Sequence, residues 1–158
     1  MIFEVADAFA EALPRPGVIL GLDLGTKTIG VALSDRLHSV ASPLHTIRRT
    51  KFGKDADLLC TLLTEHAGVG LVLGLPRNMD GSEGPRAQST RAFARNFHAR
   101  WPGPICFWDE RLSTVAAEKA LLEADTSRKR RAEVIDHVAA AYILQGLLDR
   151  LAAIRSQP

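Results

Sequence analysis

Residues 69–75, with the sequence VGLVLGL, form the apolar run that most restricts how this chain can fold. A strand with one face in water alternates apolar and polar residues, whereas this run has no polar side chain on either face. Such a strand is typical of a sheet that is covered by helices on both faces and contains parallel strands. We therefore expect an α/β fold.

The segments around this run predict the order of the other elements. The first three strands are joined by short turns and should be antiparallel, whereas the later strands alternate with helices and should be parallel, with right-handed crossovers. The result is a mixed five-stranded sheet flanked by helices, which resembles the ribonuclease H-like fold. The expected strands are residues 18–24, 28–34, 44–48, 69–75 and 105–108, and the expected helices are residues 54–66, 86–100, 113–123 and 132–153.

The chain has 158 residues, which is enough for one domain with a substantial core. We expect residues 17–155 to form a single domain and residues 1–16 to be a variable N-terminal extension with room for a short helix. The N-terminal segment has no basic start and carries acidic residues, so it does not read as a signal peptide. No apolar stretch approaches the roughly 20 residues of a membrane helix. We expect a cytoplasmic protein without membrane contact, and the two cysteines, Cys60 and Cys106, fit a reducing compartment as free thiols.

Three acidic residues are notable for their positions. Asp23 lies inside the first apolar strand, Glu110 follows the last strand, and Asp136 lies early in the last helix. Each alone is more often an ordinary solvated carboxylate. Together, at one edge of the expected sheet, they would repel one another strongly without a counter-charge. Mg²⁺ or Mn²⁺ is the simplest such charge because hard cations prefer oxygen ligands, and two such ions can promote phosphodiester hydrolysis.

Four segments resemble the YqgF/RuvX family of Holliday-junction-resolvase-like proteins. They are GLDLGTKTIGVALSD, GLPRNMDGSEGP, DERLST and RRAEVIDHVAAAYILQ, and the resemblance runs from about residue 18 to residue 151. It implies a ribonuclease H-like fold, a bacterial cytoplasmic protein and metal-dependent cleavage of phosphodiester bonds, with a role in processing the 5′ end of pre-16S ribosomal RNA. It also implies Asp23, Glu110 and Asp136 as the acidic set. Thr28 stands where the family commonly has Arg, which removes one potential phosphate contact.

Several polar and basic residues are candidates for binding nucleic acid. The net charge is only +2, so binding must depend on where the charges lie. Lys27 lies in the first turn, and Asn78 and Ser82 lie in a glycine-containing loop after a parallel strand, where ligands of open α/β sheets bind. Arg111 adjoins Glu110. The basic run of Arg128, Lys129, Arg130 and Arg131 is expected to be an exposed interhelical loop, either merely solvated or a guide for phosphates.

Two other functions are compatible with the same residues. The stretch DLGTKTIG also resembles the first phosphate loop of actin-like ATPases and sugar kinases, which would make the chain an ATP-binding fragment. Alternatively, the chain is a non-catalytic RNA-binding factor in ribosome assembly or transcription. The sequence does not choose between RNA and branched DNA as substrate. It leaves a homodimer possible, because junction resolvases usually act with two active sites.

Overall fold

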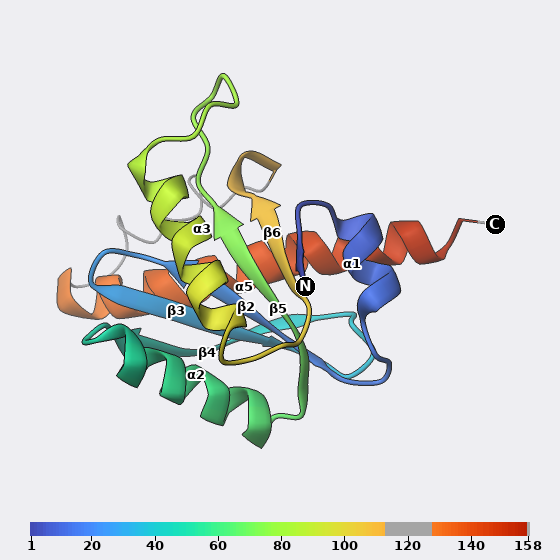
Figure 1. Ribbon diagram of the computed structural model, residues 1–158, viewed down its shortest axis with the longest axis horizontal. Coiled ribbons are helices and arrows are strands. Elements are labelled where there is room, and N and C mark those ends of the chain that lie inside the picture. The colour runs from blue at the N-terminus through green and yellow to red at the C-terminus, as the bar shows by residue number, and fades with distance from the viewer. Residues whose placement is uncertain (113–127, 158) are drawn as a thin grey trace.

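Six strands form one mixed sheet in the order β1-β6-β5-β2-β3-β4 (Figure 1). The structure, a computed structural model, describes residues 1–112 and 128–157, the first eight residues of α5 as backbone only. The strands are β1 (Ile2–Phe3), β2 (Val18–Leu24), β3 (Thr28–Ser34), β4 (Ala41–Arg48), β5 (Gly68–Leu75) and β6 (Ile105–Asp109). The helices are α1 (Ala6–Ala12), α2 (Phe52–Glu65), α3 (Pro85–His98), the short 3₁₀ helix η1 (Glu110–Leu112) and α5 (Arg128–Arg155).

The strand directions agree with the sequence prediction. β2, β3 and β4 pair antiparallel through short connections, while β2, β5 and β6 pair parallel. The first predicted strand therefore lies in the interior of the sheet, with the fourth predicted strand beside it. The carboxyl ends of β2, β5 and β6 consequently meet at one edge of the sheet.

Helices cover both faces of the sheet, as the apolar strand predicts. α2 and α3 lie in front of the sheet in Figure 1, and α5 passes behind it. Leu20, Leu22 and Leu24 of β2 enter the core under α2 and α3. Ile19, from the other side of the same strand, enters the core under α1 and α5. Strand β2 thus presents alternate residues to two separate cores.

The residues that the structure describes form one strand more than the five predicted. β1 pairs parallel with β6, with Ile2 opposite Ile105 and Phe3 opposite Cys106. The expected short helix is α1, whose Phe9 is fully buried. A strand of two residues has no alternation to detect, so no pattern in the sequence reveals β1.

The basic run is not the interhelical loop that the sequence suggested. Arg128–Arg131 form the first turn of α5, which begins four residues before the predicted start at Ala132. Straight-chain basic residues are good helix formers, and α5 continues through them. The predicted helix at residues 113–123 lies outside the described residues. Within the described part of the chain, no helix is long and apolar enough to span a membrane.

Candidate active site

Asp23 lies one residue before the end of β2 and faces α5. Gly21, two residues earlier, lies directly under α5, because a Cβ atom there would be 2.8 Å from Leu144 Cβ. Since side chains alternate along a strand, Asp23 points to the same face. Asp23 as a whole is only 4% exposed. Asp23 therefore lies within the apolar strand, as predicted, and it is buried on the face that α5 covers.

A close approach of α5 to β3 brings Asp136 to the same part of the sheet as Asp23. Gly30 is the register partner of Asp23, and a Cβ atom on Gly30 would overlap the carbonyl oxygen of Asp136. Only glycine permits this approach. Thr28 Oγ1 donates a hydrogen bond of 2.6 Å to Asp136 Oδ2. The Asp136 carboxylate is thereby fixed beside the end of β2.

Asp23 and Asp136 line one open hollow of about 360 Å³, which we call the acidic hollow. Lys27, Thr28 and Arg86 line it as well, and the backbone of the β2–β3 turn, residues 25–27, closes one side. The hollow thus combines two carboxylates with two cationic side chains. Such a site can hold a divalent cation and a phosphate together.

Glu110 approaches from the other side of Asp23. It is the first residue of η1, and its Oε1 lies 2.6 Å from the position that a Cβ atom on Gly74 would occupy. Leu22 pairs with Leu73, so continuing this register by one residue places Gly74 beside Asp23. Ile143 of α5 lies over the same glycine. Glu110 therefore extends across β5 on the face that carries Asp23 and Asp136.

The three predicted acidic residues share one edge and one face of the sheet, but they are not drawn tightly together. Among residues 1–112 and the described side chains of α5, no three His, Cys, Asp or Glu side chains are grouped closely enough to hold a metal ion. Every candidate ligand at the site is a carboxylate, and the hollow is open to water. This donor set suits a hard divalent cation that keeps several water ligands.

The loop candidates are engaged with one another. Asn78 Nδ2 donates to Ser82 Oγ at 2.9 Å, and the backbone N–H of Asn78 donates to the Ser82 carbonyl at 2.9 Å. Ser82 Oγ also donates to Asp80 Oδ1 at 2.6 Å. Neither Asn78 nor Ser82 lines the acidic hollow. The structure uses both side chains to shape the loop between β5 and α3, which protrudes from the molecule in Figure 1.

Arg111 binds Asp109 and the loop. Its Nη2 lies 2.7 Å from Asp109 Oδ2, and its Nη1 donates to the carbonyl of Met79 at 3.4 Å. The hydrogen bond from the Arg111 guanidinium lowers the pKa of Asp109 below its usual range, and the same bond raises the pKa of Arg111. Asp109 is thus ion-paired with Arg111 and does not line the acidic hollow.

Arg86 was not among the residues predicted from the sequence. This side chain lines the acidic hollow from the second residue of α3, and one of its terminal nitrogens donates to the Leu24 carbonyl at 3.3 Å. Nothing in the local sequence distinguishes Arg86 from the other arginines of α3. Its role depends on the contact between the start of α3 and the end of β2, which the sequence does not reveal. Lys27 was predicted and does line the hollow. The side chains of Arg128–Arg131 lie outside the described residues.

Comparison with known proteins gives consistent matches. The family model described as "RuvX: Holliday junction resolvase" matches residues 17–150. A protein of Paracoccus denitrificans with the name "Putative pre-16S rRNA nuclease" is 74% identical over 151 residues, which is 96% of each chain. A relative of the same name from Cereibacter sphaeroides is 71% identical and is matched over 96% of this chain and 94% of its own.

Two solved structures support the fold. RuvC of T. thermophilus in complex with a Holliday junction substrate has a TM-score of 0.53 at 11% identity, over 86% of this chain and 96% of that one. The yeast mitochondrial Holliday junction resolvase Ydc2 has a TM-score of 0.55 at 12% identity, over 95% of this chain and 85% of that one. At these identities the likeness concerns the fold alone.

Proposed function

The chain belongs to the RuvX family, and from this premise we propose that it is a metal-dependent endonuclease that processes the 5′ end of pre-16S ribosomal RNA. The observation that carries the proposal is the buried Asp23, which shares the acidic hollow with Asp136, Lys27 and Arg86. A pair of carboxylates beside a pair of cations matches the charge pattern of a phosphodiester held by divalent metal. The names of the relatives supply the RNA substrate, and the resolvase description keeps branched DNA as the other nucleic acid to test.

Asp23, Asp136 and Glu110 would hold Mg²⁺ or Mn²⁺. When bound, such ions supply an activated water and stabilise the leaving oxygen in phosphodiester hydrolysis, in a two-metal arrangement. The chain's own residues do the rest. Thr28 holds the Asp136 carboxylate in place through its 2.6 Å hydrogen bond. Lys27 and Arg86 bind the phosphate from the rim of the hollow, where opposite charge is favoured.

Four further features belong to the same proposal. Four basic residues lie five to eight positions, roughly one and a half to just over two turns, before Asp136 on α5, so they can guide the nucleic-acid backbone towards the hollow: Arg128, Lys129, Arg130 and Arg131. Asn78, Ser82 and Arg111 would meet the substrate through the protruding loop. We place the enzyme in the cytoplasm, where ribosomal RNA is processed, and propose that it acts as a homodimer when its substrate is a four-way junction.

The test is a cleavage assay with Asp23→Asn. The substitution keeps the shape of the side chain and removes one charge that would hold metal, so we expect the rate to fall by about two orders of magnitude or more. Asp57→Asn is the matched control, because Asp57 lies on α2 on the other face of the sheet with a 75% exposed side chain. Labelled pre-16S RNA and a four-way DNA junction, assayed side by side, identify the substrate.

Four results would overturn the proposal. If Asp23→Asn cleaves at the parent rate, the assigned site is wrong. If the protein is fully active in EDTA, the reaction does not depend on a divalent metal. RNA binding by the parent protein without cleavage in Mg²⁺ or Mn²⁺ favours the non-catalytic binding factor. Tight ATP binding in calorimetry, without cleavage, favours the ATP-binding fragment.

A further inference from the structure

A second pocket, of about 230 Å³, lies across the β2–β3 turn from the acidic hollow. Gly25, Thr26 and Arg86 line both spaces. The acidic hollow opens on the α5 face of the sheet, whereas this pocket opens towards α3, with Ser89, Thr90 and Phe93 in its wall. We call it the α3 pocket. A single turn of backbone separates it from the candidate catalytic carboxylates.

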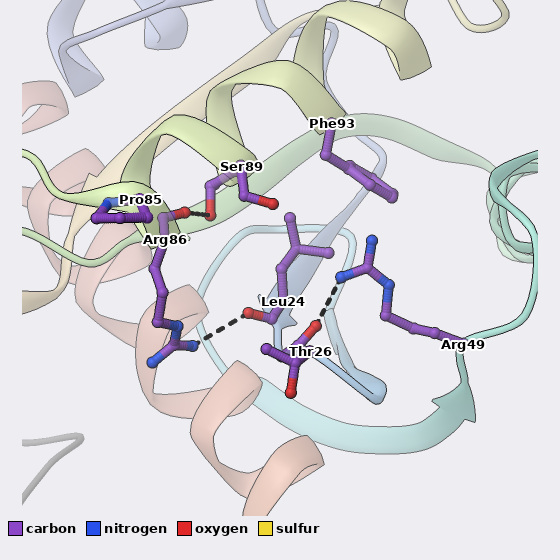
Figure 2. Close-up of a pocket in the computed structure, with 9 residues that line it drawn as sticks. Leu24, Thr26, Arg49, Pro85, Arg86, Ser89 and Phe93 are labelled. Carbon is purple, nitrogen blue, oxygen red and sulfur yellow. Dashed lines mark hydrogen bonds between the residues drawn. The ribbon is translucent and has the colours of Figure 1, made fainter.

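The α3 pocket has an apolar floor and a cationic rim. Leu24 and Phe93 form the floor, while Thr26 and Ser89 contribute hydroxyl groups. Figure 2 shows the guanidinium groups of Arg49 and Arg86 on opposite sides of the opening, with Leu24 and Thr26 between them. This combination suits a ligand that is flat and apolar in its centre and negatively charged on both sides.

Both arginines are fixed by the turn itself. Arg49 Nη1 donates to the Gly25 carbonyl at 2.6 Å, and Arg86 Nη2 donates to the Leu24 carbonyl at 3.3 Å. A guanidinium has five N–H donors, so one anchoring bond leaves others able to bind an anion. Arg49 also lies 5.8 Å from the centre of the Phe93 ring. The rim is therefore pre-organised around the opening.

We propose that the α3 pocket holds one unpaired nucleotide of the substrate strand, next to the phosphodiester bond that is cleaved. The base lies against Leu24 and Phe93, and Arg49 and Arg86 bind the phosphates on its two sides. Arg86 faces both spaces, so it links the phosphate in the acidic hollow to the nucleotide in the pocket. The inference rests on the proposed nuclease function and adds the position of the neighbouring nucleotide.

An occupied pocket restricts the kind of substrate. A base that is paired and stacked within a duplex cannot place its ring against Leu24 and Phe93, whereas an unpaired base can leave the strand and stack on protein groups. The enzyme should therefore cleave where at least one nucleotide beside the bond is single-stranded or turned out of its helix.

Binding of short RNA by the inactive Asp23→Asn protein tests the inference without cleavage. The probe is a single-stranded oligonucleotide and a series in which one base at a time is removed to leave an abasic sugar. We expect one position at which loss of the base weakens binding about tenfold, the usual scale of one stacked base. In the same background, Ser89→Trp fills the pocket and should weaken binding of the intact probe by a similar factor, with no further loss at the abasic position.

Gln88→Trp is the matched control, because Gln88 is an exposed neighbour on α3 that does not line the pocket. Equal binding by Ser89→Trp and Gln88→Trp, or a series in which no abasic position matters, overturns the inference. The inference is also overturned if the parent protein binds ATP and Ser89→Trp loses this binding while its RNA binding is unchanged. That result would assign the pocket to a free nucleotide. Failure of the nuclease proposal is seen separately, as absence of metal-dependent cleavage by the parent protein.

Discussion

Asp23 shows how a single residue acquires its role from its neighbours. Its carboxylate is buried at the end of an apolar strand, and burying a charge is costly unless positive groups or hydrogen bonds compensate. Lys27 and Arg86 line the same hollow. The sequence predicted Lys27 because it adjoins the strand, but Arg86 comes from a helix 62 residues further along than Leu24, to which it bonds. Contacts between such distant residues depend on packing and leave no local signal.

Thr28 gives a prediction at the same scale. Thr28→Val keeps the β-branched shape but removes the hydroxyl that donates to Asp136 Oδ2. We expect a cleavage rate about tenfold lower and a higher concentration of Mg²⁺ or Mn²⁺ for half-maximal rate, because the carboxylate loses the group that orients it. Thr28→Ser, which keeps the hydroxyl, should stay near the parent rate. Equal rates for the two variants would show that the hydrogen bond has no part in catalysis.

At the scale of elements, the contact between α5 and the sheet determines the site. Asp136 reaches the hollow because the helix backbone lies directly on Gly30. The sequence predicted the helix and its acidic residue, but not this closeness, since a glycine inside a strand has several possible causes. The sequence also predicted that the helix begins at Ala132, four residues too late, because the charged run reads as a loop when each residue is considered only for its charge.

Gly30→Ala tests that contact. The added methyl group would overlap the backbone of Asp136, so the helix must shift or the fold must strain. We expect the free energy of unfolding to fall by about 1–3 kcal/mol. The cleavage rate should fall by more than this loss of stability accounts for, because the shift of α5 moves Asp136. In Gly84→Ala the new methyl group meets no atom within 4 Å, so that variant should lose less than about 1 kcal/mol. Urea unfolding of the two variants provides the comparison.

The far end of α5 makes stability depend on pH. His38, between β3 and β4, is 3% exposed; its Nε2 lies 2.8 Å from the Gly17 carbonyl, and its Nδ1 lies 3.1 Å from Arg155 Nη1. With Nε2 protonated and Nδ1 accepting from Arg155, the ring is neutral. Burial has the largest effect on His38 and lowers its pKa below the ordinary value of 6.5. The hydrogen bond to Gly17 raises the pKa by a smaller amount, and the charges of Arg155 and Arg15 lower it further.

The sign of the effect follows from linkage. The unfolded chain binds a proton at His38 more readily than the folded chain does, so the free energy of unfolding falls as the pH drops below about 6.5. Urea unfolding at about pH 7.5 and pH 5.5 should show this loss. His38→Asn should show less of it, because Asn tolerates the positive φ of 62° at this position and does not titrate. His45→Gln, at an exposed site on β4, should keep the parent difference.

At the scale of the whole molecule, charge placement matters more than net charge. A net charge of +2 predicts no general affinity for nucleic acid. The fold nevertheless gathers Lys27, Arg49 and Arg86 around one turn, and the start of α5 carries four more cationic residues on the same helix as Asp136. The sequence predicted the order of strands and helices and the common edge of the three carboxylates, because these follow from periodicity and crossover rules. The α3 pocket could not be predicted, since its walls come from three separate segments.

Salt dependence measures the contribution of the basic run. Replacing Arg128, Lys129, Arg130 and Arg131 by Gln should weaken binding of all RNA sequences alike. If each residue contacts a phosphate of one strand, the slope of log affinity against log salt should become shallower by up to about 3, at roughly 0.7 per contact. Cleavage at saturating substrate should change less than binding does. If both the slope and the affinity are unchanged, the basic run does not bind nucleic acid and contributes only to solubility.

The two-residue strand β1 has a consequence for the behaviour of the protein in concentrated solution. β6 is an apolar strand whose outer backbone groups would otherwise be open to pairing with another chain, which is a route to aggregation. β1 covers the first part of that edge, at Ile105 and Cys106, and the N–H of Ile105 donates to the carbonyl of Met1 at 3.0 Å. At the opposite edge, β4 carries Pro43, which cannot donate to a neighbouring strand. Both borders of the sheet thus discourage self-association through strand pairing.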